Sequence, residues 1–469
     1  MKFKIFLVAA LLSVLTLKNA AAEDLPLDYF FKNPEFAGFQ LSPNGKELAA
    51  MVNLNDRMNL AIIDLKTRKA RAVTNEKKQD VSGFMWATNE RLLFFMDKDG
   101  SESFGIFAVN SDGSMPRTLV EPLDSVIKSG GKSKLRIVSV LDVLEDEPDW
   151  VLVSSNERRA AYPDVFRMNI MNGKTSLVER NPGHVTGWFT DWDGNVTGAA
   201  FQDELEVGFM LLRDPEADEW ETITQTRFDA PSFMPAGISG DGKNGYVSSN
   251  LTPEGEARDK SAIYEYNFET KTFGKLVYEH PVVDCCSLIL NRKMRDMIGV
   301  SYMVGEPEVV YLDEDWKNTM AAIDQAMPDT TNRLISLDDA ETIGVIAASS
   351  STQPPRYFLF DFVNRKLEWM ADSRPWVDSS KMSEMKPYSF QARDGRLLHG
   401  YLTVPVGSIK HAKVMEKALK KSGVDYELMV KRDEGHGFRK EENRYDFYGK
   451  MDTFLAEHLK PAKAASANP

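Results

Sequence analysis

The chain has 469 residues and a formal net charge of −13, with 57 Lys and Arg against 70 Asp and Glu. This length allows two or more domains with large cores, and the acidic balance excludes the broad basic face that binds nucleic acid or anionic lipid. The two cysteines, Cys285 and Cys286, exclude a disulfide framework. No histidine pair lies near them and the chain has no phosphate-cradling glycine loop, so we expect idle thiols on a strand, no metal and no cofactor.

The first residues have the features of an export signal. Two lysines precede an uncharged apolar run from Ile5 to Leu17, and Ala20-Ala21-Ala22 supplies small residues before an acidic one. This order is typical of a secretory signal peptide that is cleaved after Ala22. A membrane anchor is the alternative, but the run is shorter than the roughly 20 apolar residues that span a bilayer. We therefore expect residues 1–22 to be removed and the protein to be periplasmic or secreted, without stable membrane insertion.

From Phe39 to about Trp376 helical periodicity is nearly absent. Short apolar, β-branched and aromatic runs alternate with Gly-, Asn- and Asp-rich turns such as Ser42-Pro43-Asn44-Gly45. The spacing of roughly 50 residues matches four-stranded propeller blades and predicts seven of them over 23–380. Six or eight blades stay open because Asp284–Asp338 is poorly marked, and a large β-sandwich would not explain the repeat. The units close near Leu119, Leu177, Ile223, Leu276 and Leu367.

The pattern changes over residues 381–460. Two strands flank the Asp394-Gly395 turn, which is a strong hairpin signal, and helical periodicity with a glycine stop follows. The lysine- and alanine-rich residues 461–469 are predicted to be a disordered tail. The predicted elements are strands over Tyr388–Arg393, Leu397–Val404 and Tyr426–Lys431, a helix from Ile409 to Gly423, and a helix from about Glu442 to Leu459.

One histidine stands out. His436 lies between Gly435 and Gly437, directly after a predicted strand and before a predicted helix. A ring in this position can project at the sheet edge where α/β folds place catalytic groups. The alternative is a surface-loop histidine without a task. The other histidines are scattered, none at metal-ligand spacing, and are interpreted as structural or exposed.

Segments 383–404 and 409–459 resemble the start and the last quarter of the hydrolase domain in prolyl-oligopeptidase-family serine peptidases. The residues that carry the resemblance are Ala392-Arg393-Asp394-Gly395 and Gly435-His436-Gly437-Phe438, and Leu41–Gly45 resembles the start of the family's propeller. The dipeptidyl-aminopeptidase and acylaminoacyl-peptidase group is the most similar arm. The resemblance implies a mainly β chain, with a seven-bladed β-propeller followed by a truncated α/β-hydrolase remnant at 381–460. It also implies short peptides as ligands.

In this family the histidine of the Gly-His-Gly loop is the general base of a Ser-Asp-His triad, so the resemblance assigns that role to His436. The serine should lie in a Gly-x-Ser-x-Gly elbow, and no serine of the chain lies in that pattern. The oxyanion-hole segment and the stretch that carries the catalytic aspartate are missing as well. Val404–Gly407 looks like the scar of an in-frame deletion, and both a genuine deletion and a wrongly joined gene model stay open.

The sequence thus predicts a peptidase relative that is catalytically incomplete. A non-catalytic, peptide-binding propeller is the alternative, and hydrolysis with a group from another subunit is a third hypothesis. Because the hairpin and the last strand lack their neighbouring strands, we expect the remnant to dock loosely on the propeller or to fluctuate. The oligomeric state is not predicted.

Overall fold

The computed structural model describes residues 27–458 apart from short internal stretches. The stretches outside the described residues are 99–101, 123–135, 204, 215–218, 228, 240–242, 286, 292–296, 305, 383–384, 386–387, 392, 396, 401–418, 422–425 and 432–437. The predicted signal peptide (1–22) and tail (461–469) also lie outside the described part of the chain. Both therefore stay predictions.

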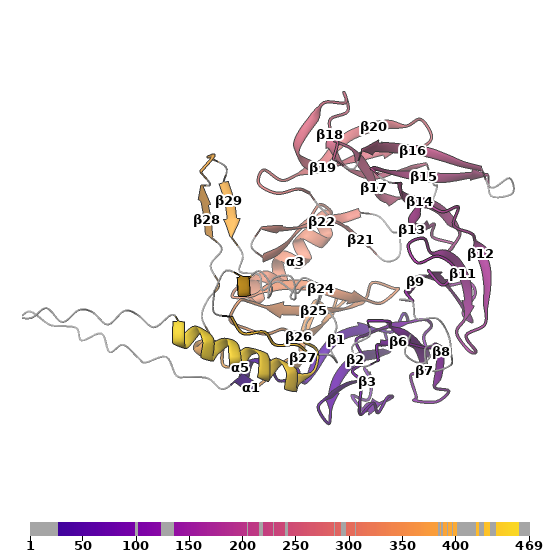
Figure 1. The fold of residues 1–469 in the computed structure, drawn as a ribbon. Coiled ribbons are helices and arrows are strands. Elements are labelled where there is room, and N and C mark those ends of the chain that lie inside the picture. Colours follow the sequence, from indigo (N-terminus) through magenta and orange to yellow (C-terminus); the bar gives the residue numbers. More distant parts are fainter. Residues whose placement is uncertain are drawn as a thin grey trace, which may run out of the picture.

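The described residues form seven antiparallel sheets arranged in a ring, which confirms a seven-bladed propeller (Figure 1). Blade 1 has β1 (Phe36–Leu41), β2 (Glu47–Leu54), β3 (Arg57–Asp64) and β4 (Ala70–Ala72), and blade 2 has β5 (Gly83–Trp86), β6 (Arg91–Met96), β7 (Gly105–Asn110) and β8 (Arg117–Val120). Blade 3 has β9 (Val138–Val143), β10 (Trp150–Ser155), β11 (Asp164–Asn169) and β12 (Thr175–Glu179).

Blades 4 and 5 repeat the same up-and-down order. They contain β13 (Val185–Thr190), β14 (Val196–Asp203), β15 (Glu206–Asp214) and β16 (Glu219–Arg227), then β17 (Phe233–Ile238), β18 (Asn244–Leu251), β19 (Ala257–Asn267) and β20 (Thr272–Glu279). Blade 7 has β24 (Thr331–Leu337), β25 (Ile343–Ser349), β26 (Arg356–Asp361) and β27 (Lys366–Asp372). The closing strands β8, β12, β16, β20 and β27 contain the five positions at which the sequence predicted the units to close.

Blade 6 departs from the repeat. Its described strands are β21 (Ser287–Leu290), β22 (Met297–Val304) and β23 (Glu306–Tyr311), and helix α3 (Glu314–Ala326) follows. The side chain of Asp313 caps α3 by accepting hydrogen bonds from two first-turn backbone N–H groups. Met320 and Ile323 of α3 pack against Ile346 and Phe360 of blade 7. The expectation of almost no helix between Phe39 and Trp376 was therefore wrong here, and α3 explains why Asp284–Asp338 is poorly marked as a repeat.

The propeller closes between blades 1 and 7 by side-chain packing. Within the described strands, each of these two blades is built from one continuous piece of chain. Phe39 of β1 is buried, and its ring centre lies 4.5 Å from that of Tyr357 in blade 7. The backbone N–H of Leu41 donates to Ser336 Oγ at 2.9 Å, and that of Asp339 donates to the Pro43 carbonyl at 2.8 Å. An apolar cluster and two hydrogen bonds thus join blades 1 and 7 and close the ring.

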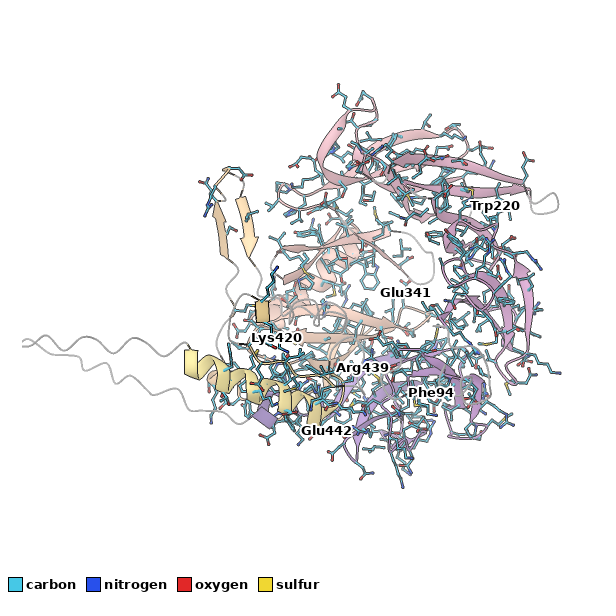
Figure 2. The ribbon with its side chains drawn as sticks, viewed as in Figure 1. Phe94, Trp220, Glu341, Lys420, Arg439 and Glu442 are labelled. Atoms are coloured by element: carbon cyan, nitrogen blue, oxygen red, sulfur yellow. The ribbon has the colours of Figure 1, made fainter. Side chains whose placement is uncertain are left out.

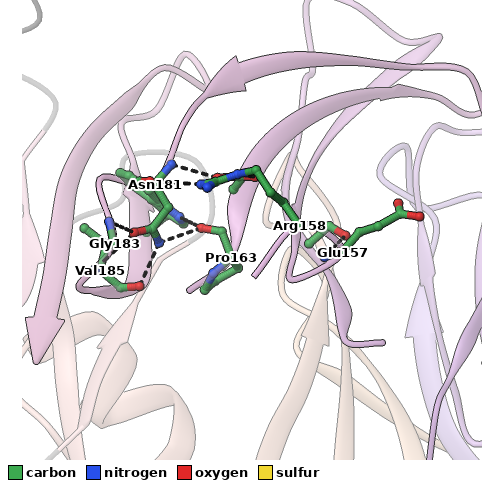
Figure 3. Close-up of polar contacts among 9 residues, drawn as sticks. Glu157, Arg158, Pro163, Asn181, Gly183 and Val185 are labelled. Atoms are coloured by element: carbon green, nitrogen blue, oxygen red, sulfur yellow. Dashed lines mark hydrogen bonds and ion pairs between the residues drawn. The ribbon is translucent and has the colours of Figure 1, made fainter. Parts of the chain in front are cut away.

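A buried polar network joins blades 3 and 4 (Figure 3). Arg158 Nε donates to Asp164 Oδ2 at 2.8 Å, and the backbone N–H of Asn181 donates to Asp164 Oδ1 at 2.8 Å. The Asn181 side chain donates to the carbonyls of Pro163 and Val185, both at 2.8 Å. A buried polar group is costly unless it is hydrogen-bonded. A different course of the chain between the two blades would leave these groups without partners, so the network favours the observed connection.

The C-terminal segment contains the predicted hairpin and last helix. β28 (Tyr388–Gln391) pairs with β29 (Leu397–Gly400) around Gly395, whose φ is +84°, and α5 spans Glu441–His458. The predicted strand over Tyr426–Lys431 is wrong, because its described residues pair with no strand. Residues 419–421 are helical, and the rest of the predicted Ile409–Gly423 helix lies outside the described residues. The 3-10 helix η1 (Ser379–Lys381) follows the propeller.

The loose docking expected of the remnant stays a prediction, and the described contacts with the propeller involve α5. Its N-terminal end contacts the short helix α1 (Leu27–Phe31) and blade 1, whereas the hairpin stands away from the ring (Figure 1). Among the described helices, none combines the length and apolar character needed to cross a bilayer.

Cys285 corrects another expectation. It is buried, but it lies in the crossover between blades 5 and 6 rather than on a strand, and it is disulfide-bonded rather than a free thiol. The hydroxyl of Ser261 donates to its carbonyl at 2.6 Å, so neighbouring strands hold this crossover in place. Cys286 lies outside the described residues.

Candidate functional site

The predicted catalytic residue His436 lies outside the described residues, so its role stays a prediction. Its C-terminal flank is described. The ring centre of Phe438 lies 4.8 Å from that of Phe447 in α5. The guanidinium of Arg439 lies 5.0 Å from the ring centre of Phe104, in the loop before β7 (Figure 2). This flank therefore reaches blade 2 at the N-terminal end of α5.

The first strands of the blades line the axis of the propeller. β1 contacts both β5 and β24, β9 contacts β13, and β17 contacts β21. Such radial packing leaves a central channel whose size depends on the side chains that point into it.

A cavity of about 740 Å³ lies where four of these first strands end. Its walls come from the ends of β1, β5, β9 and β24 and from the turns after them. This volume is within the range of about 300–1,000 Å³ that small-ligand sites occupy. Its lining includes the edge of the largely buried Trp86, and Glu145, Asp146 and Asp339 are its charged residues. The cavity therefore has an acidic mouth.

A second cavity of about 680 Å³ lies between blades 6 and 7. It shares Ile335, Ser336 and Leu337 of β24 with the first cavity, so both open along the same strand. Its charged lining residues are Arg333, Asp284 and Glu308, and most of its other lining residues are apolar. Helix α3 packs against β23 and β24, the strands that bound this gap.

Two tyrosines of the second cavity are held in their protonated form. Burial, together with the charge of Asp324, raises the pKa of Tyr311 to about 12. Burial and hydrogen bonds with Tyr278 and Glu308 raise the pKa of Tyr302 well above its ordinary value. The Tyr302 hydroxyl donates to Glu308 Oε2 at 2.9 Å. Both phenols are therefore hydrogen-bond donors at neutral pH rather than bases.

Neither cavity brings a histidine next to a hydroxyl nucleophile among its lining residues. Two of the described histidines pack on aromatic rings, His184 5.5 Å from Phe201 and His280 4.4 Å from Tyr302. No group of three or more metal-binding side chains occurs within the described part of the chain. Both cavities have volumes in the range that small-ligand sites occupy.

Comparisons with known proteins agree with this architecture. A family model described as the prolyl oligopeptidase family matches residues 344–462. The C-terminal part of the chain is therefore similar to this family.

Two curated relatives match most of the chain. It is 25% identical over 399 residues to dipeptidyl aminopeptidase BIII of Pseudoxanthomonas mexicana, which covers 82% of this chain and 54% of the relative. It is 21% identical over 413 residues to dipeptidyl peptidase family member 6 of Caenorhabditis elegans, covering 86% and 54%. The chain thus spans about half the length of the curated relatives it matches.

A solved structure supports the fold alone. Prolyl oligopeptidase B from Galerina marginata matches with a TM-score of 0.50 at 10% identity, over 80% of this chain and 56% of that one. The sequence assigned a catalytic role to His436 from its motif, which stays a prediction, and it missed both cavities. Part of the cavity walls consists of turns that follow the first strands of blades. The sequence predicted one of these turns, Ser42-Pro43-Asn44-Gly45, but a turn signal does not predict a cavity next to it.

Proposed function

We propose that this chain is an exported relative of the serine peptidases that does not itself cleave peptides. One observation carries the proposal: no serine of the sequence lies in a Gly-x-Ser-x-Gly elbow. A serine hydroxyl is a poor nucleophile until an adjacent imidazole takes its proton and a carboxylate orients that imidazole. His436 has neither partner among the motifs of the chain. Asp433 and Glu434 precede it in sequence, but neither matches the family's aspartate.

Peptide turnover tests this proposal. The purified chain should release no chromophore from dipeptidyl p-nitroanilides above the buffer rate, and His436→Ala should change nothing. Turnover that disappears in His436→Ala would overturn the proposal, because it would require an activated nucleophile that the imidazole serves. Circular dichroism of both proteins would show that they are equally folded.

Export is part of the proposal and is supported by the order of charged, apolar and small residues over 1–22. In a Gram-negative host, N-terminal sequencing of the periplasmic fraction should find a mature chain that begins at Glu23. A chain that retains Ile5–Leu17 and sediments with membranes would indicate an anchor instead.

A second candidate function is peptide binding in the first cavity, the one at the ends of β1, β5, β9 and β24. The observation that favours it is the combination of volume and an acidic mouth at Glu145, Asp146 and Asp339. A short peptide presents an amino terminus or a lysine to such a mouth and apolar side chains to the interior. We therefore propose cationic short peptides as the preferred ligands.

Calorimetry with the tripeptides Lys-Ala-Ala and Glu-Ala-Ala distinguishes this function. Lys-Ala-Ala should bind more tightly, and the double variant Glu145→Gln, Asp146→Asn should weaken it by about two- to fivefold, as expected for exposed charges. Glu254→Gln, an exposed acid in a blade 5 turn, is the matched control. Equal heats from both peptides, or no heat at millimolar peptide, would rule out this candidate.

A further inference from the structure

The N-terminal helix contacts the C-terminal helix. The ring of Phe31, the last residue of α1, stacks on the ring of Tyr448 in α5 with centres 3.9 Å apart and planes inclined by 9°. The two described ends of the chain thus meet beside blade 1, as Figure 1 shows.

Asn33 connects this helix pair to the propeller. It is only 5% exposed. Its backbone N–H donates to Glu441 Oε2 at 3.1 Å, and its side-chain Oδ1 accepts from Arg444 Nη2 at 2.6 Å. Its side-chain Nδ2 donates to the carbonyl of Asp56 at 3.3 Å, in the turn between β2 and β3. One buried residue therefore links α5 to a blade 1 turn, and two of its bonds are to charged groups.

Charged side chains surround this contact with alternating sign. Arg57 of β3 lies 3.8 Å from Glu442 of α5 and 4.0 Å from Asp80. Figure 2 places Glu442 and Arg439 at the end of α5 that reaches the blades. Arg374, after blade 7, donates to the carbonyls of Phe30 and Lys32 at 3.1 and 2.7 Å. These contacts tie α1 to the end of the propeller as well.

The network is not fully satisfied. Arg444 Nε is buried and has no hydrogen-bond partner among the described residues. Burial and, next, the charge of Arg444 lower the pKa of Arg374, which shows that the two cations repel each other across the contact. A buried network that is only partly satisfied is held less firmly than an apolar core. The contact therefore combines definite geometry with modest strength.

We propose that Phe31 and Asn33 form a clasp by which the N-terminal segment holds α5 against blade 1, and that this clasp opens as a unit while the propeller stays folded. α5 follows closely on Gly435-His436-Gly437 in the sequence, so the clasp anchors the chain on one side of that motif. The position of α5 therefore depends on residues of the N-terminal segment. This inference does not depend on whether peptides bind or are cleaved.

Hydrogen exchange measured by mass spectrometry tests the clasp in the full chain. Asn33→Ala removes the side-chain bonds to Arg444 and to the blade 1 turn, so amides of α5 should exchange at least about tenfold faster. Amides of β2 and β3 should keep their wild-type rates. Phe31→Ala removes the aromatic contact by a separate route and should act in the same direction. Asn181→Ala, a buried asparagine between blades 3 and 4, is the matched control and should leave α5 unchanged.

Two results would overturn the clasp. If both Asn33→Ala and Phe31→Ala leave α5 exchange at the wild-type rate, the contact does not hold the helix. If β2 and β3 accelerate by the same factor as α5, the contact belongs to blade 1 and does not open separately. Raising NaCl to about 1 M should also speed α5 exchange alone, because it screens the half-exposed charges of the contact.

Discussion

The propeller and the C-terminal segment are stabilised in different ways. In the propeller, apolar clusters fill the interfaces between neighbouring blades, so each blade buries its faces against the next. The C-terminal segment has a two-stranded hairpin and the helix α5, and α5 is held by an aromatic stack, a buried asparagine and ion pairs. Stability in repeat proteins is roughly a sum over neighbouring interfaces. The propeller is therefore stabilised by continuous apolar packing, whereas α5 is held by a few aromatic and polar contacts.

The largest expected effect on the free energy of unfolding is that of a Phe→Ala substitution in the propeller, compared with the same substitution in α5. Phe209 of β15 is fully buried, and its ring centre lies 5.2 Å from that of Phe189. Phe209→Ala should lower the free energy of unfolding by about 3–5 kcal/mol, because it removes buried area and leaves a cavity. Phe454→Ala in α5, where the side chain is 38% exposed, should lower it by less than about 1 kcal/mol. Urea unfolding measures both, and equal losses would contradict the comparison.

A smaller effect concerns Asp164, which is 2% exposed between blades 3 and 4. Burial alone would raise its pKa, but hydrogen bonds from Arg158 and the Asn181 N–H outweigh burial and hold the pKa below its ordinary value. Because the folded pKa is the lower one, this carboxylate stabilises the fold above about pH 4, and the contribution is lost as the pH falls through the folded pKa. Asp164→Asn should therefore cost about 2 kcal/mol at pH 7 and progressively less toward pH 3.

The control for this prediction is an exposed pair of the same kind. Arg227 Nε lies 3.0 Å from Asp229 Oδ1, and both side chains are 62% exposed. Asp229→Asn should change the unfolding free energy by no more than about 0.5 kcal/mol at either pH. A pH-independent loss in Asp164→Asn, measured by urea unfolding at several pH values, would show that charge is not what stabilises this junction.

The smallest effect lies within the propeller, at its irregular blade. Asp313 accepts from the backbone N–H groups of Asp315 and Trp316 at 3.0 and 2.9 Å and so caps α3. Asp313→Ala should cost about 1 kcal/mol and raise hydrogen exchange in α3. Asp315→Ala, in the first turn of the same helix, is the control and should cost less. If hydrogen exchange instead rose equally in all blades, α3 would unfold together with the propeller strands rather than separately.

Much of the propeller could be predicted from the sequence because each blade repeats turn and strand signals. The closings near Leu119 and Leu276, for example, fall in β8 and β20. Blade 6 could not be predicted in the same way, because α3 interrupts the repeat. Trp316, Met320 and Ile323 do have helical spacing, so the signal was present but short.

The C-terminal segment shows where sequence patterns are insufficient. Residues 388–400 form the predicted hairpin because the Asp394-Gly395 turn and both strands are local. The alternating residues Tyr426–Lys431 do not form a strand, since a strand needs a partner and no neighbouring strand lies beside them in the described structure. His436 was found from its motif alone. The cavities could not be found, because their volume depends on how whole blades pack.

The most direct test of the central claim is labelling of the purified chain with a fluorophosphonate probe, followed by intact mass spectrometry. The probe reacts with serines that a neighbouring base activates. The account predicts that the mass of the chain stays unchanged, because no serine of the sequence lies in a Gly-x-Ser-x-Gly elbow. A single added probe mass that maps to one serine and is lost in His436→Ala would contradict it.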